Sequence, residues 1–185
     1  MLGQQLGVRV AKNKVLQFLY KIVRNTSHST RIYFVMDSPT NRELETWHTY
    51  LAATTRMMER LDGELQQHSH ISLTDYEILD TLVLIDSKKI RMSELANKVL
   101  VSRSRLTYRV DRLVQIGYLE RQECEDDRRG LWAILTQAGL EAHQKAQPGH
   151  EKDIKNWFFD NLNETELVVL DRVMSRIKDK LESNR

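Results

Sequence analysis

The sequence predicts a mainly α-helical protein with one small β-hairpin, and three observations indicate this fold class. The chain has 185 residues, of which 41% are hydrophobic and 29% charged, enough to bury the core of one domain or of two small ones. It contains only seven Gly and two Pro, so long helices are permitted. Apolar residues recur every three or four positions over much of the chain, which is the spacing of one helix face.

Cysteine content and hydropathy limit where the protein can work. Cys124 is the single cysteine, so no internal disulfide can form. No apolar run approaches the roughly 20 residues that span a bilayer. We therefore expect a cytoplasmic protein with no membrane partner.

The first 35 residues differ from the rest in charge. They contain six Lys or Arg and no Asp or Glu, and because the net charge of the whole chain is +2, about −4 is left for the remainder. We expect residues 1–36 to form a basic extension, either helical or disordered. Such an arm could contact nucleic acid or a membrane surface. The favoured interpretation is that these residues are an appendage, or that they come from an upstream start while translation usually begins at Met36.

Residues 41–67 are predicted to form one long helix with a single apolar stripe. The stripe consists of Leu44, Trp47, Leu51, Thr54, Met58, Leu61 and Leu65. A second helix follows, in which Ser72 or Thr74 can cap the first turn, and "DSKK" ends it. Its predicted buried face consists of Tyr76, Leu79, Leu82 and Val83.

Two short helices joined by a tight turn are predicted next. The first is expected to start at Ser93, after a brief extended stretch at residues 90–92. The second is capped by Ser102 and stopped by Gly117. Two such helices form a helix-turn-helix, in which the second helix fits the major groove of DNA.

The start of this second helix is rich in side chains that bind nucleic acid. Arginine can form two hydrogen bonds to guanine or neutralise a phosphate, and hydroxyl groups bind phosphate oxygens. The candidate DNA-binding residues here are Ser102, Arg103, Ser104, Arg105, Thr107, Tyr108 and Arg109. The competing interpretation is a solvated helix face, on which Asp111 pairs with Arg109 or Arg112.

A predicted hairpin after this helix favours the DNA interpretation. Two strand candidates, "YLERQEC" and "LWAILT", flank the loop "EDDRRG". A recognition helix followed by such a hairpin is a winged helix-turn-helix, whose wing can place Arg128 or Arg129 in the adjacent minor groove or along the phosphates. Asp127 either holds one of these guanidinium groups in a fixed direction or only helps to form the turn.

The C-terminal part is predicted to be helical. A long helical stretch after Thr136 is expected to bend near Pro148, and the last helix carries one apolar stripe. The stripe consists of Leu167, Leu170, Met174, Ile177 and Leu181. Apolar stripes at both ends of the chain need a partner, either the second chain of a homodimer or the first helix of the same chain. A homodimer is favoured because one helix-turn-helix makes too few contacts for specific affinity.

The run "VDRLVQIGYLER" and the hairpin after it resemble the core of the MarR transcriptional regulators. In that family the recognition helix ends in VDRLxxxGxLxR. The wing that follows contains Asp, then Arg or Lys, then Arg, and after a few apolar residues it closes with LTxxG. The positions that match the wing pattern are Asp127, Arg128, Arg129, Leu135, Thr136 and Gly139. The resemblance runs from about Asn41 to about Leu181, and residues 1–35 lie outside it.

The resemblance implies a homodimer that reads a palindromic operator with one winged helix on each half. Residues 72–139 would form the winged helix-turn-helix of a domain spanning 41–185, flanked by dimerisation helices at 41–67 and 140–184. Members of the family often bind small aromatic or phenolic ligands between the dimer helices and the winged helix. The candidate effector-binding residues are Trp47, His48, Tyr50 and Tyr76, which as core aromatics would need no ligand.

Cys124 lies on the first strand of the predicted wing and is a candidate redox residue, because some members of the resembled family sense oxidants with cysteines. Its acidic neighbours Glu123 and Glu125 disfavour the reactive thiolate, so a passive side chain is the favoured interpretation. No HExxH, glycine-rich phosphate loop, GxSxG or CxxC motif occurs, and the pair His68 and His70 is too small for a metal site. We expect no enzyme activity, no metal and no cofactor.

The sequence therefore predicts a regulator that binds specific double-stranded DNA. We expect a repressor that acts as a homodimer on a palindromic operator and responds to a small molecule or an oxidant. The alternative is a winged-helix module that binds protein and not DNA. A protein-docking face would carry apolar residues, whereas this face carries Arg103, Arg105, Arg128 and Arg129, which favours DNA.

Overall fold

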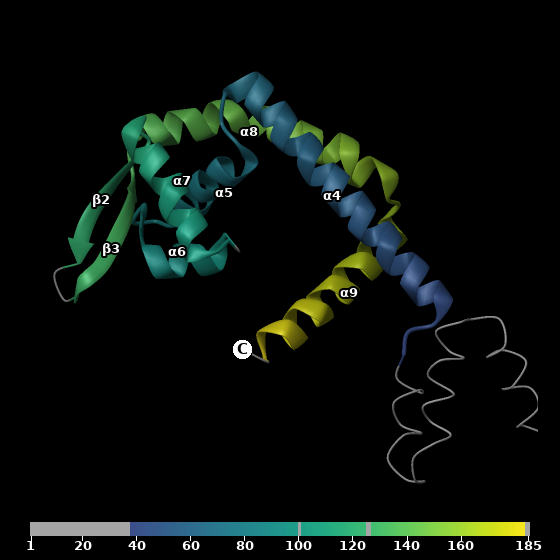
Figure 1. Ribbon diagram of the computed structural model, residues 1–185. Coiled ribbons are helices and arrows are strands. Elements are labelled where there is room, and N and C mark those ends of the chain that lie inside the picture. Colours follow the sequence, from purple (N-terminus) through teal and green to yellow (C-terminus); the bar gives the residue numbers. More distant parts are fainter. Residues whose placement is uncertain (1–37, 100, 125–126, 184–185) are drawn as a thin grey trace, which may run out of the picture. The chain divides into compact units, whose positions relative to one another are not determined.

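The computed structural model describes residues 38–99, 101–124 and 127–183, and it describes the backbone but not the side chains of residues 127–129. The predicted basic extension at residues 1–36 lies outside this range. The chain divides into two compact units, residues 1–50 and 51–185. The second unit contains the helices and strands that build the predicted helix-turn-helix and wing (Figure 1).

The first described helix, α4 (Asn41–Ser69), agrees with the long helix expected at residues 41–67. Thr40 and Glu43 begin it with reciprocal contacts: the Glu43 carboxylate accepts from the Thr40 amide at 2.6 Å, and the Thr40 hydroxyl accepts from the Glu43 amide at 3.3 Å. Only Leu61 and Leu65, near its end, are buried. The rest of the predicted apolar stripe is mostly exposed in the single chain.

Helix α5 (Leu73–Val83) is capped by Ser72, one of the two predicted candidates, and not by Thr74. The Ser72 hydroxyl accepts from the Asp75 amide, and the Asp75 carboxylate accepts from the Ser72 amide, which satisfies two backbone donors at the helix start. Its expected inward residues Tyr76, Leu79 and Leu82 are buried, and Val83 is partly buried.

Strand β1 (Lys89–Arg91) and helix α6 (Met92–Lys98) follow without a loop between them. The expected helix start at Ser93 is wrong, because Arg91 is the N-cap and forms no side-chain cap bond. Arg91 is paired with Trp132 in the sheet, which holds it extended, so the helix can begin at the next residue. The extended stretch expected at 90–92 is therefore a sheet strand shifted by one position.

Helix α7 (Arg103–Gln115) starts at the predicted cap Ser102. Gly117 ends it with φ of 78°, a left-handed conformation that a glycine adopts without a Cβ penalty. The Tyr118 amide then donates to the Leu113 carbonyl at 2.9 Å, and the Gly117 amide to the Val114 carbonyl at 3.0 Å. These two bonds form a Schellman motif, which turns the chain into the wing.

The wing consists of β2 (Leu119–Cys124) and β3 (Asp127–Leu135), and the antiparallel sheet has the order β1-β3-β2. The hairpin is longer than the strand candidates suggested. Cys124 pairs with Asp127 after a bulge between Glu123 and Cys124, so the residues expected in the loop extend β3 at its start.

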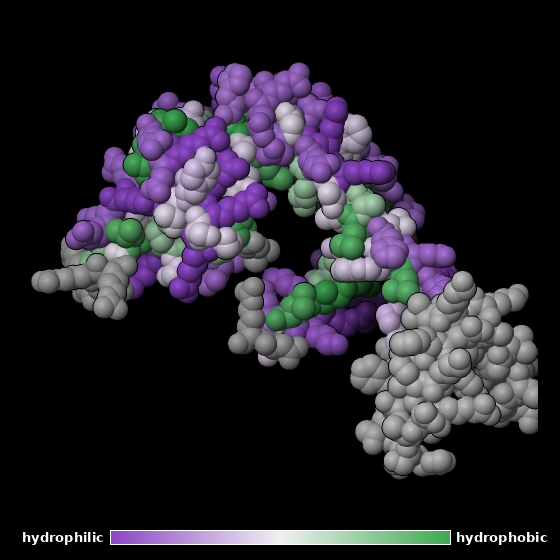
Figure 2. Space-filling view, viewed as in Figure 1, coloured by the Kyte–Doolittle hydropathy of each residue, from purple (hydrophilic) through white to green (hydrophobic). Residues whose placement is uncertain are grey.

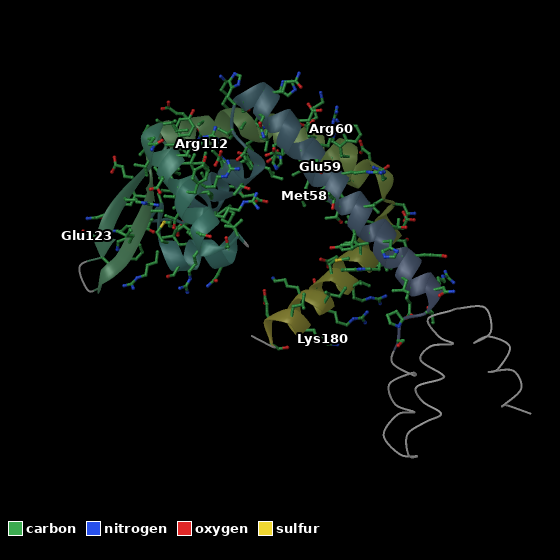
Figure 3. The ribbon with its side chains drawn as sticks, viewed as in Figure 1. Met58, Glu59, Arg60, Arg112, Glu123 and Lys180 are labelled. Atoms are coloured by element: carbon green, nitrogen blue, oxygen red, sulfur yellow. The ribbon has the colours of Figure 1, made fainter. Side chains whose placement is uncertain are left out.

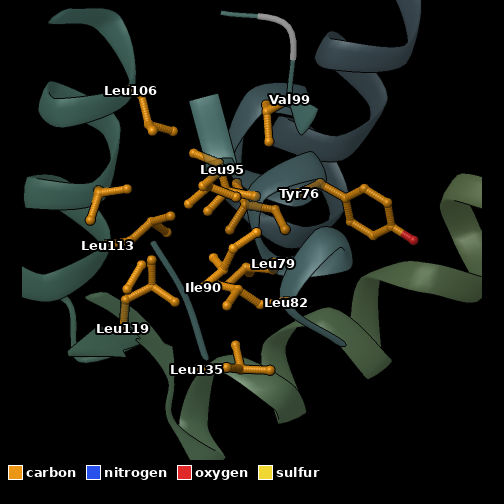
Figure 4. Packing of buried hydrophobic residues seen from close by; sticks show 14 of the residues in the cluster. Tyr76, Leu79, Leu82, Ile90, Leu95, Val99, Leu106, Leu113, Leu119 and Leu135 are labelled. Carbon is orange, nitrogen blue, oxygen red and sulfur yellow. The ribbon is translucent and has the colours of Figure 1, made fainter. Parts of the chain in front are cut away.

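The core of the winged helix lies between α5, α6, α7 and the sheet (Figure 4). Its fully buried members include Ile78, Leu79, Leu95, Val110 and Leu113. Burial of each such aliphatic side chain contributes about 1.5–3 kcal/mol. This packing fixes α7 against the other helices.

The C-terminal part consists of α8 (Gln137–Trp157), a short 3-10 helix (Phe159–Asn161) and α9 (Glu164–Glu182). Helix α8 continues through Pro148, and within the winged helix it packs against α5. No helix among the described residues is long and apolar enough to cross a membrane.

Candidate nucleic-acid interface

Helix α7 is amphipathic, and its two faces have different chemistry. Leu106, Val110 and Leu113 are buried in the core. The residues at the start of the helix that point away from the core are exposed, and they are Arg103, Ser104, Arg105, Thr107 and Tyr108. Tyr108 is 68% exposed, although it is a large aromatic residue. The structure therefore brings these five predicted residues onto one open surface.

The charge at the start of α7 is opposite to what helix stability favours. The first turn contains Arg103 and Arg105 and no acidic residue, yet the partial positive charge of a helix N-terminus is stabilised by anions. Each such cation costs about 0.3–1 kcal/mol at an exposed site. A phosphate group would be attracted both by the arginines and by the free amides of the first turn. The surface is thus complementary to an anionic partner.

The hydroxyl groups of this surface are already partly engaged. Ser102 Oγ accepts from the Arg105 amide at 3.3 Å and lies 3.2 Å from Ser104 Oγ, and Thr107 Oγ1 donates to the Arg103 carbonyl at 2.9 Å. Thr107 retains oxygen lone pairs, and serine hydroxyls each have one hydrogen to donate. One of these two serines donates to the other, so the pair has one hydroxyl hydrogen left for a phosphate oxygen, while Ser102 also holds the helix start in place.

Arg109 differs from the other candidate residues because its side chain is only 21% exposed and is bound inside the chain. Its guanidinium donates to Ser72 Oγ at 3.2 Å and lies 3.5 Å from Asp75 Oδ2. Arg112, labelled in Figure 3, reaches the same Asp75 oxygen at 3.4 Å. Asp75 is 1% exposed, so a buried carboxylate on α5 holds two arginines of α7.

Sequence reasoning did not find this role of Asp75. Its position three residues after a serine indicates a capping box, which the structure confirms, but gives no sign of the two arginines. Ser72, Arg109 and Arg112, but not Asp75, also line a pocket of about 460 Å³, together with Gln66, His70 and Tyr108.

Asp111 also has a different partner from the one expected. It pairs with Arg121 of β2 at 2.5 Å, and not with Arg109 or Arg112. Arg121 in addition donates to the Thr107 carbonyl at 3.2 Å. One arginine of the wing strand is therefore bonded to two positions on the recognition helix, which fixes the wing relative to α7.

The tip of the wing carries three further candidates. The backbone of Asp127, Arg128 and Arg129 forms the start of β3, but their side chains lie outside the described part, so their contacts stay predictions. Cys124, at the end of β2, is buried. A buried thiol reacts slowly with oxidants, which agrees with the passive interpretation without testing it.

The four candidate effector residues have different surroundings. Trp47 and Tyr50 are exposed and stack with ring centroids 5.7 Å apart, and His48 is also exposed. Tyr76 is buried between α5 and α8, and burial, helped by Asp80 and Glu151, raises the pKa of its hydroxyl to about 12. Their proposed role in ligand binding stays a prediction.

A metal site does not emerge from the histidine pair near the end of α4. His68 is exposed and contacts Glu64 at 3.3 Å, and His70 has a positive φ of 58° after the helix end. Within the described ranges, no group of three or more His, Cys, Asp or Glu is arranged to hold a metal ion.

A helix-turn-helix with an exposed basic recognition helix and an attached three-stranded sheet, whose β2 and β3 form the wing, defines a winged helix-turn-helix protein. Comparison with known proteins gives the family. Residues 71–131 match the MarR family. The structure of AbsC, a MarR family transcriptional regulator from Streptomyces coelicolor, is 34% identical, and the match covers 79% of this chain and 98% of AbsC with a TM-score of 0.73.

Two further relatives agree. Sco3205, a MarR family regulator from Streptomyces coelicolor solved in complex with DNA, is 32% identical over 78% of this chain and 91% of its own, with a TM-score of 0.74. PecS, a transcriptional regulator of Dickeya dadantii, is 29% identical over 73% of this chain and 81% of its own. The chain therefore belongs to the MarR family of transcriptional regulators, which are not enzymes.

Proposed function

We propose that this protein is a sequence-specific regulator of transcription that binds double-stranded DNA as a homodimer on a palindromic operator and acts as a repressor. The observation that carries the proposal is the exposed start of α7, where Arg103, Arg105 and Tyr108 are exposed while Leu106 and Val110 are buried. Arg105 and Tyr108 would contact bases or phosphates in the major groove. Because its partner is chromosomal DNA, the protein would work in the cytoplasm.

The likeness to Sco3205 supports the DNA-binding part of the proposal. That relative, at 32% identity, is described as bound to DNA. A protein-docking winged helix, the alternative function, would present apolar side chains at its centre. The first two turns of α7 instead expose arginines and hydroxyl groups, with Tyr108 as the one large exposed ring.

The last helix supports the homodimer. Helix α9 exposes apolar side chains along its length, as the green surface in Figure 2 shows, and the exposed Met174, Ile177 and Leu181 recur every three or four residues on one face. A monomer rarely leaves such a continuous apolar face in water. A second copy would cover this face and place a second recognition helix on the other half of a palindrome.

Signal response is the finer part of the proposal. A small aromatic or phenolic ligand is the effector class that the family suggests, with Trp47, His48, Tyr50 and Tyr76 as candidate contacts. An oxidant acting at Cys124 is the less favoured signal, because the thiol is buried.

The test starts by mapping where the protein binds in its own genome and measuring affinity for a bound fragment and for a shuffled sequence of equal length. Arg105→Ala and Tyr108→Ala should each weaken operator binding by about 1–3 kcal/mol and leave the dimer intact. Gln115→Ala, an exposed position at the far end of α7, is the matched control and should bind as the wild type does. Equal affinity of the wild type for operator and shuffled DNA would favour the protein-docking alternative.

A further inference from the structure

We propose that the contact between α5 and α8 is a proton-sensitive joint, built from Tyr76, Asp80, His143 and His150, whose protonation loosens α8 from the winged helix and weakens operator binding. The effect on operator binding rests on the proposed function. The effect on stability does not depend on DNA.

The joint is a stack of three rings from two helices. The Tyr76 ring of α5 lies 5.0 Å from the His143 ring in a stacked arrangement and 4.4 Å from the His150 ring in a tilted one. The two histidines are seven residues apart on α8, which is two helical turns or about 10.5 Å along the axis. The Tyr76 ring therefore fills the space between them. Figure 4 shows this ring at the edge of the hydrophobic core.

His143 adds a hydrogen bond to the stack. It is 1% exposed, and its Nε2 lies 2.8 Å from Asp80 Oδ1, on the α5 turn after Tyr76. Its Nδ1 is buried without a hydrogen-bond partner. The neutral ring can donate from Nε2 to Asp80 and leave only an acceptor atom, Nδ1, unpaired.

His150 is the group whose protonation is most strongly opposed. It is 7% exposed, and its Nδ1 also has no hydrogen-bond partner. Burial lowers the pKa of His150, and the nearby carboxylates Asp153, Asp80 and Glu151 offset this only in part, while His143 adds to the lowering. A charged imidazole on the Tyr76 face would gain some cation–π attraction, but burial prevails.

The direction of the pH effect follows from this lowered pKa. In the unfolded chain His150 takes up a proton near its usual pKa of about 6.5, and in the folded protein only at lower pH. The folded state is therefore fully favoured above about pH 6.5, and stability is lost as the pH falls below that value toward the pKa of the folded protein.

The location of the joint connects it with DNA binding. Helix α5 also holds α7 through Asp75, which pairs with Arg109 and Arg112. Helix α8 leads through the short 3-10 helix into α9, whose apolar face we assign to the dimer. The ring stack therefore joins α5, which contacts the recognition helix, to α8, which continues into the proposed dimer helix α9. Loosening the stack would disturb the spacing of the two recognition helices in the dimer.

The experiment compares wild type, His150→Gln and His143→Gln, with His68→Gln as the matched control, since His68 is an exposed histidine on α4. Proton NMR of the imidazole ring protons gives the titration midpoint of each histidine. Thermal melts at fixed protein concentration give the stability from pH 7.5 to 5. Anisotropy of the operator DNA gives the affinity over the same pH range. The wild type and His68→Gln should lose stability and affinity on acidification. His150→Gln should lose less of both, with a difference in affinity of at most about tenfold per pH unit for one linked proton.

Three results would overturn the proposal. One is a His150 midpoint at or above the usual histidine value of about 6.5. The second is an acid response of His150→Gln and His143→Gln that equals that of the control in both melts and affinity. The third is that the histidine variants lose less thermal stability on acidification than the control, while operator affinity falls by the same factor in all four proteins. That result would refute the link to DNA binding. If the wild type binds no operator at neutral pH, the proposed function fails, and the NMR and melting results still decide whether the joint is proton-sensitive.

Discussion

At the scale of single residues, the central finding is that the arginines of α7 have separate tasks. Arg103 and Arg105 are exposed at the start of the helix, whereas Arg109 and Arg112 contact Asp75. Arg121 from the wing pairs with Asp111. Two arginines of α7 are thus exposed to solvent, and three arginines, Arg121 included, hold this helix in position.

Asp75→Asn should lower the free energy of unfolding by about 1–3 kcal/mol, because two guanidinium groups lose their shared carboxylate while the cap geometry can persist. It should also weaken operator binding, since Arg109 and Arg112 no longer fix α7 on α5. Urea denaturation at fixed protein concentration measures the first effect. Asp86→Asn, at an exposed position after α5, is the control, and an Asp75 variant as stable as this control would contradict the assigned role.

Cys124→Ser should bind operator and respond to peroxide as the wild type does, because the thiol is buried and flanked in sequence by Glu123 and Glu125. Operator affinity before and after peroxide treatment checks this. If peroxide released the wild type from DNA but left the variant bound, Cys124 would be the sensor.

At the scale of secondary-structure elements, the contact between the start of α8 and the turn into β2 is sterically tight. Gly139 lies in the first turn of α8, where an added Cβ would overlap the Tyr118 carbonyl oxygen and come within 2.9 Å of Leu135 Cδ1. Thr136 reinforces this contact, since its hydroxyl donates to the Gly117 carbonyl at 2.7 Å and accepts from the Gly139 amide at 3.0 Å. A side chain at position 139 would separate the two elements.

Gly139→Ala should therefore destabilise the protein by about 1–3 kcal/mol, because backbone atoms must move to admit one methyl group. Gly149→Ala, in the same helix, is the matched control. A Cβ at position 149 meets no atom within 4 Å, so that variant should gain about 0.5–1 kcal/mol from helix propensity. Thermal melts measure both, and an equal effect of the two substitutions would show that space at position 139 is not limiting.

The wing provides the second prediction at this scale. Arg129→Ala and Arg128→Ala should each lower affinity for operator and random DNA together. Each should also reduce the magnitude of the negative slope of log affinity against log salt by roughly one for each phosphate that the protein no longer neutralises. Asp127→Ala should act in the same direction but more weakly, if it only orients an arginine. Titrations at several salt concentrations measure the slope. Arg172→Ala removes an equal charge from exposed α9, and a wing variant with the slope of this control would mean that the wing does not touch DNA.

At the scale of the whole molecule, the single chain leaves the apolar face of α9 exposed to solvent, which is unfavourable unless a partner covers it. Met174, Ile177 and Leu181 recur along this helix and remain exposed. Apolar burial between two copies would supply the main free energy of dimerisation, and the dimer would supply the second half-site contact. Oligomeric state and operator affinity should therefore change together.

Ile177→Asp should shift the protein from a dimer toward a monomer of 21.8 kDa, because an unpaired carboxylate buried in the interface costs about 3–5 kcal/mol. Operator binding should disappear with the dimer. Light scattering after size exclusion measures the mass, and Lys178→Asp, at the adjacent exposed position, should remain dimeric. An Ile177 variant that stays dimeric would place the dimer contact elsewhere.

The sequence by itself determined the features that depend on neighbouring residues. Helical periodicity identified α4, α5, α7 and α9. The cap Ser102 and the stop Gly117 lie where the sequence predicted them, and Ser72 is one of the two caps predicted for α5. The exposed candidates at the start of α7 were also found, because the periodicity assigns Leu106, Val110 and Leu113, and none of these candidates, to the buried face of this helix. Capping, periodicity and turn formation are local interactions, so they can be deduced within one or two turns.

The tertiary structure alone decided which distant residues meet. Strand β1 exists because β3 supplies its hydrogen bonds, and that pairing moved the start of α6 to Met92. The ion pairs of Asp75 and Asp111 and the bond between His143 and Asp80, which are 63 positions apart, depend on how whole helices pack. Arginines and histidines on a helix surface have many possible partners in sequence, and only the packing of the hydrophobic core brings one of them within hydrogen-bond distance.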